Sequence, residues 1–522
     1  MVSCQFGTVP TTGILARLFA HFSSFGDCNY RFPGSPTSSS GLRELVVPLS
    51  KVLLAFGGTK EAGMAISGRV RAHHLRMPFR ALLVCVAFAG AAGFTAFPAT
   101  ASGRAQSSSG AVSLHASPNV IGSQLAEFFP DPLGAAFSQF GFSVAISGNT
   151  ALVGDPYYPN GEIGDSCACT GEALVFTKSR RGWTETDQLI GSDSAAGDDF
   201  GFSVAISGGM LIVGAPHHQV GTNAAQGAAY VYVNTSSDGL WSQEAELTSD
   251  IGGFGGTANE VYGASVAISG TSAIVGAFGA YVSGVQVGAA YAYNESGGNW
   301  HPDGLLSSSI PGTFGGSVAI SGKTAVVGAH TQQVGSNGGE GAAYVYTEHQ
   351  DSWALAGELT PSDGGAEDSF GYSVAVSGTT VVVGSPDHQV GGNINQGSAY
   401  VFSKSGSAWP QTAELTASPD PAPYQNFGWS VSVTGSPHHS YTVLVSRVDI
   451  KIVYVPPCCT GYVYTGTGNT WTPAAEVEPS DAQAADSFGD SVSVSGTTAL
   501  IGAELHQVGS VRGEGAAYVF SS

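Results

Sequence analysis

Polar loops of two kinds recur along the chain, and both contain residue types that bind cations or polar ligands. The acidic loops carry Asp193, Asp198 and Asp199, then Asp363 and Asp368, then Asp481 and Asp486. Loops of the second kind contain Gln-Val-Gly, preceded by His in three copies: His218-Gln219, His388-Gln389 and His506-Gln507. Carboxylates suit hard cations, and imidazole binds metals or polar groups. Such residues also cap turns and satisfy loop backbone in every repeat, and this structural role is the favoured interpretation.

Catalytic motifs are not found around these loops. The sequence contains no G-x-S-x-G, no H-E-x-x-H and no unique Cys-His pairing, and every His near a carboxylate belongs to a repeated loop. An enzyme needs polar residues that are unique to one site. The sequence therefore favours a protein without enzymatic activity but does not exclude an enzyme.

The elements that position these loops belong to a unit that occurs seven times. Each unit begins with an aromatic residue and Gly, followed by alternating small residues as in S-V-A-I-S-G; the seven copies start at Phe140, Phe200, Tyr262, Phe314, Phe370, Phe427 and Phe488. Alternation with period two predicts a strand, and three further short strands follow in each unit, the third reading G-A-A-Y-V-Y and the fourth starting at Trp and ending A-E-L-T. Four antiparallel strands in each of seven units predict an all-β, seven-bladed β-propeller.

The strand inventory also predicts how the ring closes. There are seven first strands and seven third strands, but only six Trp-led fourth strands. The missing strand is expected before the first Phe-Gly, where Ala126-Glu127-Phe128 resembles Gly357-Glu358-Leu359. The N-terminal segment is therefore expected to supply the outer strand of the last blade. In this topology the second-to-third and fourth-to-first connections lie on one face, so the carboxylates and histidines should share it.

The motif F-G-x-S-V-A-I-S-G followed by V-G-A-P, as at Gly214-Ala215-Pro216, resembles the FG-GAP repeat of integrin α-subunit propellers and of bacterial and algal extracellular proteins. The resemblance covers about residues 119–522 and implies an extracellular, adhesion-type module. It also implies Ca²⁺ in the turns between first and second strands. Those turns read SGN, SGG, SGT, SGK, SGT, TGS and SGT, and contain no carboxylate. We therefore expect no cofactor, and at most weak Ca²⁺ binding at the acidic loops, where Asp193, Asp198 and Asp199, or Asp363, Glu367 and Asp368, would converge.

Composition agrees with a packed repeat protein and limits its partners. Gly accounts for 74 of 522 residues and charged residues for only 11 %. Residues 1–104 hold ten of the 18 Lys and Arg and three of the 39 Asp and Glu, so the net charge of −21 is concentrated in the remainder. An acidic body repels phosphate, so nucleic acid is not an expected partner.

The N-terminal region contains an expected export signal. Arg76 and Arg80 precede an apolar run at residues 81–97, and Ala99-Thr100-Ala101 follows it. We interpret residues 77–101 as a signal peptide, with a signal anchor as the alternative, residues 1–76 as an unstructured pre-region or gene-model extension, and residues 102–118 as a linker. No other segment is expected to insert into a membrane, and the protein is expected to be secreted or at the cell surface.

Two pairs of cysteines and two sequons agree with export. Cys167 with Cys169 and Cys458 with Cys459 are the disulfide candidates, and a zinc site is the alternative. The sequons at Asn234 and Asn294 are expected in exposed turns after third strands, on the face opposite the acidic loops.

Three functions remain in view. The expected one is an extracellular binding or adhesion module that recognises protein or glycan through one loop face. A secreted enzyme acting on polysaccharide or peptide at the propeller channel and a structural cell-surface or matrix protein are the alternatives. The oligomeric state is left open.

Overall fold

The structure is a computed structural model, and it describes residues 120–130, 136–158, 169–234, 240–250, 256–350, 352–418, 421–436, 438–448, 460–481, 483 and 486–522. All of these residues lie within the unit Ser108–Ser522. The segments at 1–76, 77–101 and 102–118 lie outside the described residues. In the described ranges all regular elements are β-strands, and no helix there could cross a membrane.

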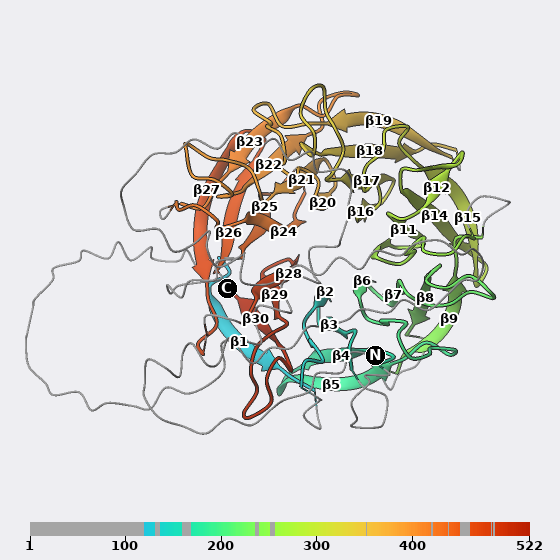
Figure 1. Cartoon of the computed structure of the whole chain (residues 1–522). Helices are drawn as coiled ribbons and strands as arrows, with labels where there is room; N and C mark the ends of the chain where they lie inside the picture. The colour runs from blue at the N-terminus through green and yellow to red at the C-terminus, as the bar shows by residue number, and fades with distance from the viewer. Residues whose placement is uncertain are drawn as a thin grey trace, which may run out of the picture. The chain divides into compact units, whose positions relative to one another are not determined.

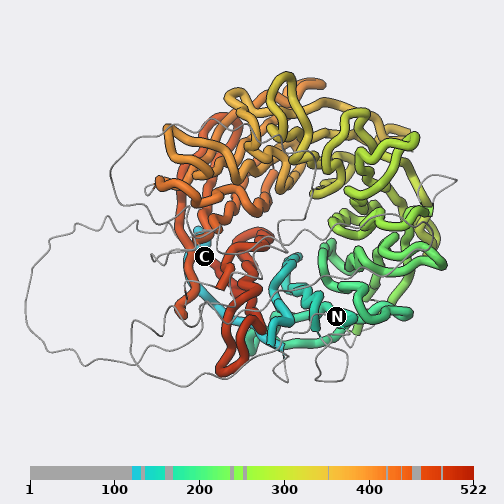
Figure 2. The backbone as a smooth tube through the Cα atoms, in the orientation of Figure 1, coloured from blue at the N-terminus to red at the C-terminus, as the bar shows by residue number. Residues whose placement is uncertain are grey.

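Seven four-stranded antiparallel sheets form the blades of a ring (Figure 1; Figure 2). Blades 1 to 6 consist of β2-β3-β4-β5, β6-β7-β8-β9, β10-β11-β14-β15, β16-β17-β18-β19, β20-β21-β22-β23 and β24-β25-β26-β27, and blade 7 consists of β28-β29-β30-β1. The predicted seven-bladed β-propeller is confirmed.

The first and second strands of the blades lie toward the centre of the ring (Figure 1). The first strands are β2 (Ser143–Ser147), β6 (Ser203–Ser207), β10 (Ser265–Ser269), β16 (Ser317–Ser321), β20 (Ser373–Ser377), β24 (Phe427–Thr434) and β28 (Phe488–Ser495). The second strands are β3 (Thr150–Asp155), β7 (Met210–Ala215), β11 (Ser272–Ala277), β17 (Thr324–Ala329), β21 (Thr380–Ser385), β25 (Tyr441–Arg447) and β29 (Thr498–Ala503).

The third and fourth strands complete each blade toward the rim. The third strands are β4 (Glu172–Ser179), β8 (Ala228–Val233), β14 (Ala289–Ser296), β18 (Ala342–Glu348), β22 (Ser398–Ser403), β26 (Thr460–Thr467) and β30 (Ala516–Ser521). The fourth strands are β5 (Gly182–Leu189), β9 (Ser242–Leu247), β15 (Asn299–Leu306), β19 (Trp353–Leu359), β23 (Gln411–Leu415), β27 (Thr470–Val477) and β1 (Ser123–Phe128). Among the described residues, an added hairpin occurs in blade 3 alone, where β12 (Tyr281–Val282) pairs with β13 (Val285–Gln286).

Blade 7 closes the ring with strands from both ends of the described chain. β1 pairs antiparallel with β30, with Ser123 opposite Ser521 and Phe128 opposite Ala517. In Figure 1 the cyan β1 lies beside the red β30. Phe128 also stacks on Phe176 of blade 1, with ring centroids 4.2 Å apart. The N-terminal segment therefore supplies the missing fourth strand, as the repeat count predicted. This strand, β1, contacts both blade 7 and blade 1 at the closure.

The aromatic residue of each Phe-Gly pair is buried between neighbouring blades. Phe200 is 0 % exposed and belongs to a core cluster that includes Leu152 and Val175 of blade 1 and Leu211 and Tyr230 of blade 2. The backbone N–H of Phe200 donates to the carbonyl of Thr170, just before the third strand of blade 1. The aromatic side chain of Phe200 therefore fills the space between two sheets, while its backbone N–H bonds the previous blade.

Glycine is required in this pair because the backbone has a positive φ and no room is left for a Cβ atom. Gly201 has φ +93°, and a Cβ built there would lie 2.2 Å from the carbonyl oxygen of Glu172 in the previous blade. A side chain would therefore be strained and would collide with backbone. The Gly201 N–H also donates to the carbonyl of Gly214 in the G-A-P segment of the same repeat, so the two halves of the motif are in contact.

Serine hydroxyls of the first strands connect each blade to the next. The first Ser of the S-V-A-I-S segment donates to the carbonyl of the Gly in the next Phe-Gly pair, as Ser203 Oγ does to Gly263 O at 2.7 Å. The same bond is made by Ser143, Ser265, Ser317, Ser373 and Ser491. At the other end of the strand, Ser147 Oγ accepts from the N–H of Gly208 in the next blade. The repeated serines therefore act as inter-blade links.

Candidate functional site

The second-to-third and fourth-to-first connections of the blades come together on one face, which we call the loop face. His218, in the connection between β7 and β8, contacts Asp198, in the connection between β5 and β6: the distance from Nδ1 to Oδ2 is 2.8 Å. His388 contacts Asp368 at 2.7 Å and His506 contacts Asp486 at 2.8 Å in the same way. The expected sharing of one face by the carboxylates and histidines is confirmed.

Each of these aspartates is buried and fixed by the backbone. Asp198 Oδ2 also accepts the N–H of Ala195, three residues earlier, at 2.7 Å. Asp368 and Asp486 accept the N–H groups of Gly365 and Gln483. All three aspartates are 4–5 % exposed. Each therefore caps its own turn, as the structural interpretation predicted, and at the same time orients a histidine.

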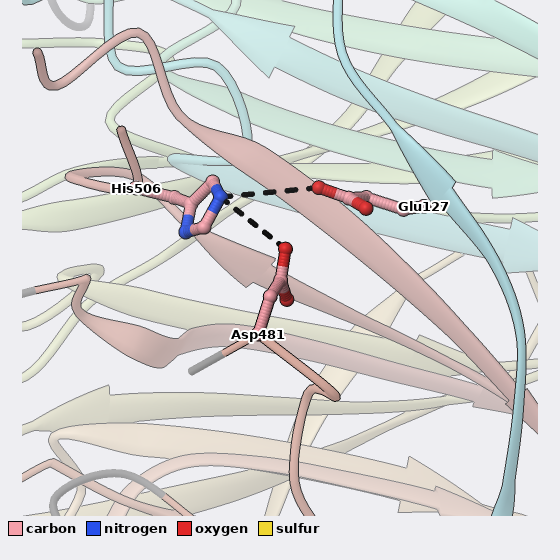
Figure 3. A group of neighbouring side chains, drawn as sticks. All are labelled: Glu127, Asp481 and His506. Atoms are coloured by element: carbon pink, nitrogen blue, oxygen red, sulfur yellow. Dashed lines mark ion pairs between the residues drawn. The ribbon is translucent and has the colours of Figure 1, made fainter. Parts of the chain in front are cut away.

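The other ring nitrogen of each histidine points at two further carboxylates. His218 Nε2 lies 3.6 Å from Asp193 Oδ2 and 4.0 Å from Glu246 Oε1. In blade 7, His506 Nε2 lies 3.6 Å from Asp481 Oδ2 and 3.9 Å from Glu127 Oε1 (Figure 3). Blade 5 repeats the arrangement with His388, Asp363 and Glu414, and in all three groups the ligand atoms lie within 4.8 Å of one another. We call these three groups the Asp-His-Glu clusters.

A tyrosine of the third strand holds the aspartate of each cluster. Tyr230 OH donates to Asp193 Oδ1 at 2.8 Å, which leaves Oδ2 facing the histidine. Tyr400 bonds Asp363 at 3.0 Å and Tyr518 bonds Asp481 at 3.1 Å. Burial is the main cause that raises the pKa of each of these tyrosines, and the hydroxyls therefore stay protonated donors at neutral pH.

The carboxylates of each cluster favour a positive charge at the centre of the cluster, such as a protonated histidine. The pKa of His218 is raised, chiefly by its hydrogen bond to Asp198, against the opposing effect of burial. For His388 and His506 burial is the largest effect and lowers the pKa, but the bond to the buried aspartate and the nearby carboxylates leave the pKa raised. Burial, followed by the neighbouring aspartate, raises the pKa of Glu246 and of Glu127.

The remaining predicted loop residues have separate partners. Asp199 contacts His217 Nδ1 at 2.7 Å. Gln219 and Gln507 donate from Nε2 to the carbonyls of Gly221 and Gly509 within their own turns. Gln389 is exposed. Asp193 and Asp198 therefore lie at opposite ring nitrogens of His218, while Asp199 contacts His217, so the three carboxylates do not converge on one point as the sequence suggested.

Sequence reasoning missed the glutamate of each cluster and the tyrosine that bonds its aspartate. Glu246, Glu414 and Glu127 occupy the Glu position of the fourth-strand A-E-L motif, and Tyr230, Tyr400 and Tyr518 occupy the first Tyr position of the third strand. A signal was present, because the Asp-to-His separation is 25 residues and the Asp-to-Tyr separation is 37 residues in all three copies.

The cysteines and sequons are only partly within the described chain. Cys169 is disulfide-bonded. Cys167, Cys458 and Cys459 lie outside the described residues. Asn234 follows β8 and is exposed, as expected, in a connection opposite the loop face. Asn294 differs from the expectation: it lies within β14, opposite His301, and is half-buried, because the β14–β15 pairing continues to Ser296.

Most of the exposed large apolar side chains lie on the loop face. Twelve are exposed among the described residues, and nine of these lie in loop-face connections. The nine are Phe129, Phe137, Ile190, Phe278, Tyr281, Val285, Ile310, Ile394 and Tyr424. The β12–β13 hairpin contributes Tyr281 and Val285, which are 53 % and 51 % exposed.

The closed ring of four-stranded antiparallel sheets defines the chain as a β-propeller. The sequence model of the FG-GAP repeat matches residues 183–232, 241–293, 312–346, 353–402 and 471–520. With five matched repeats in seven blades, the chain is an FG-GAP repeat propeller protein.

Comparison with other proteins adds little to this family assignment. The search of curated proteins gives no match. Among solved structures 326 chains match; one is the crystal structure of Saccharomyces cerevisiae Sqt1, with 9 % identity and a TM-score of 0.38, covering 77 % of this chain and 99 % of that one. The fold is defined by the strand pairing above rather than by this likeness.

Proposed function

We propose that the chain is a secreted or cell-surface binding module that recognises a protein or glycan ligand through the loop face. The observation that carries the proposal is the concentration of exposed apolar side chains on this face, nine of twelve among the described residues. Exposed apolar side chains that gather in one region are typical of surfaces that bind partners, whereas isolated ones are normal.

The β12–β13 hairpin is the best candidate for the centre of this surface. It replaces the His-Gln-Val-Gly loop of blades 2, 5 and 7, and its Tyr281 and Val285 are about half exposed while neighbouring Ala280 is buried. Aromatic anchors on a rigid support commonly dominate interface energetics. Val282 of the hairpin packs against the core cluster of blades 2 and 3, which contains Tyr262.

Two further aromatic residues are exposed at a position of the repeat where the backbone is left-handed, a conformation that Asn259 and Glu367 share in other blades. Phe137 and Tyr424 each precede a Phe-Gly pair by three residues, have φ of 66° and 64°, and are 61 % and 44 % exposed. A bulky residue in the left-handed region is strained, and such strain occurs at functional sites when the surrounding structure maintains it. Backbone bonds from Phe137 to Arg512 and from Tyr424 to Ile394 fix both residues.

Export is supported by separate observations. The predicted signal at residues 77–101 and the resemblance to extracellular FG-GAP proteins favour it. The disulfide at Cys169 favours it as well, because disulfides persist in oxidising compartments.

Protein and glycan arrays probed with the purified protein test the proposed function. We expect saturable binding, reduced about tenfold or more by Tyr281→Ala with Val285→Ala. The matched control is Leu125→Ala with Leu355→Ala, which removes equally exposed apolar side chains from outer strands and should leave binding unchanged. Equal loss in both double variants, or no saturable binding, would contradict the proposal, and turnover of a polysaccharide or peptide would favour the enzymatic alternative.

A further inference from the structure

The Asp-His-Glu clusters of blades 2, 5 and 7 contain a space between their ligand atoms. The five distances from the histidine Nε2 atoms to the carboxylate oxygens run from 3.6 to 4.0 Å. These distances exceed a hydrogen bond. Two ligands of a tetrahedral cation at ~2.0–2.1 Å lie about 3.4 Å apart, so small side-chain movements would bring all three atoms onto one cation.

The histidines are oriented as metal-binding histidines are. Each is 4–6 % exposed and has its Nδ1 atom bonded to a buried aspartate. Protein histidines that bind metals usually donate their other N–H to a carboxylate, which fixes the ring and directs the free lone pair at the metal. In the described part of the chain no hydrogen bond reaches these Nε2 atoms, so a buried ring nitrogen is aimed into the cluster.

The carboxylates are oriented as well. Each tyrosine hydroxyl bonds one oxygen of the cluster aspartate, and the other oxygen faces the histidine. Asp193 and Glu246 remain 49 % and 32 % exposed in their side chains, so a cation can enter and water can complete its shell. The set therefore comprises a fixed nitrogen, two oxygens and an open position.

The equivalent position in blade 4 has no gap between its polar side chains. Gln332 stands where blades 2, 5 and 7 have histidine, and its Nε2 donates to Glu358 Oε1 at 3.2 Å while its Oε1 accepts from Tyr344 OH at 2.8 Å. The side chains in blade 4 satisfy one another directly. The gap in blades 2, 5 and 7 is thus a property of the Asp-His-Glu set and not of the blade geometry.

We propose that blades 2, 5 and 7 each bind one Zn²⁺ ion through the histidine Nε2, the loop aspartate and the fourth-strand glutamate. One imidazole with two carboxylates suits zinc, whereas Ca²⁺ takes six to eight oxygen ligands. Each site joins the fourth-to-first connection that leads into a blade to that blade's second-to-third loop and fourth strand. The inference is independent of the proposed function, since it concerns the clusters and not the apolar surface.

Zinc titration of the chelator-treated full chain by calorimetry, at pH 7.5, tests the inference. We expect three equivalents, falling to two in each of His218→Gln, His388→Gln and His506→Gln and to none in the triple variant. Glutamine is chosen because Gln332 shows that a blade accepts it. His330→Gln is the control: this half-buried histidine bonds Thr313 away from the clusters, and three equivalents should remain.

A second measurement separates these sites from cysteine sites and from folding effects. Cobalt added in place of zinc should give an absorption spectrum without thiolate charge transfer, and the triple variant should abolish that spectrum while its circular dichroism stays unchanged. Absence of saturable zinc binding, or equal stoichiometry in the wild-type protein and the folded triple variant, would overturn the inference.

Discussion

Ser491 in blade 7 donates its hydroxyl hydrogen to the carbonyl oxygen of Gly141 in blade 1, at 3.0 Å and across 350 residues of sequence. The bond is the same one that Ser203 makes to Gly263 between blades 2 and 3. The closure of the ring therefore uses the same inter-blade contact as the blades that follow one another in the chain.

Ser491→Ala is expected to lower the free energy of unfolding by about 1–2 kcal/mol, because the buried Gly141 carbonyl loses its side-chain partner. Ser203→Ala should cost a similar amount, and the exposed Ser242→Ala less than ~0.5 kcal/mol. Denaturant unfolding of the three variants measures the differences. A loss at Ser203 without a loss at Ser491 would show that the closing interface is looser than the others.

Phe128→Ala should be much more damaging than a neighbouring change on the same strand. Phe128 is 4 % exposed and stacks on Phe176, whereas Leu125 is 51 % exposed. We expect Phe128→Ala to cost about 3–5 kcal/mol and to promote aggregation by releasing β1 from the edge of blade 7, and Leu125→Ala to cost little. Thermal melting with light scattering compares the two. Similar melting temperatures would contradict the role of β1 in closure.

The glycine of the Phe-Gly pair should not tolerate a methyl group. Gly201→Ala places a Cβ about 2.2 Å from the Glu172 carbonyl at φ +93°, so the blades must separate, and we expect misfolding or poor soluble yield. Gly208→Ala is the matched control, since its φ is +59° and a Cβ there would have no atom within 4 Å, and it should cost only about 1 kcal/mol. Comparable soluble yield and melting for both variants would refute the close approach.

Glu172 should make stability fall as pH rises. Burial raises its pKa from 4.5 to about 7, an effect that the hydrogen bond from Gln188 opposes and the charge of Glu185 reinforces. Burial is also the largest cause that raises the pKa of Asp155 and of Tyr158, and the charge of Glu172 adds to it in both. Between pH 4.5 and about 7, Glu172 therefore keeps a proton in the folded state that it has lost in the unfolded state. The contribution of this proton to the free energy of unfolding is complete below pH 4.5 and is lost as the pH rises through 7.

Glu172→Gln should remove this dependence. The free energy of unfolding of the variant, relative to wild type, should increase from pH 4.5 to pH 7.5 by roughly 3 kcal/mol, at ~1.4 kcal/mol for each pKa unit. Urea unfolding of both proteins across this range provides the comparison. A difference that does not change with pH would show that Glu172 stays ionised in the folded protein.

Most of the fold follows from local patterns in the sequence. Phe-Gly recurs at each blade boundary, alternation marks the short strands, and one unmatched third strand at residues 516–521 points to a partner near Phe128. The inter-blade role of Ser203 and its equivalents could not be read from these patterns, because a serine in a strand of small residues looks the same whether or not its hydroxyl reaches a carbonyl in another blade.

The candidate site was predictable only where it lies in loops. Asp198 and His218 stand out against Gly-rich turns, and the blade topology places them together. Tyr230 and Glu246 occupy ordinary strand positions, where alternation hides which residues face the loop end of the blade. Asn294 was misplaced for a similar reason, since sequence does not show how far β14 and β15 stay paired.

The pairing of β1 with β30 also decides how the ring would respond to a pulling force. Ser123, where the chain enters β1, lies opposite Ser521, where it leaves β30. Tension applied to the chain on both sides of this pair would load the hydrogen bonds one at a time, from Ser123 toward Phe128, instead of shearing all of them together. Blade 7 would therefore open first and at low force, and the other six blades would still have all four of their strands.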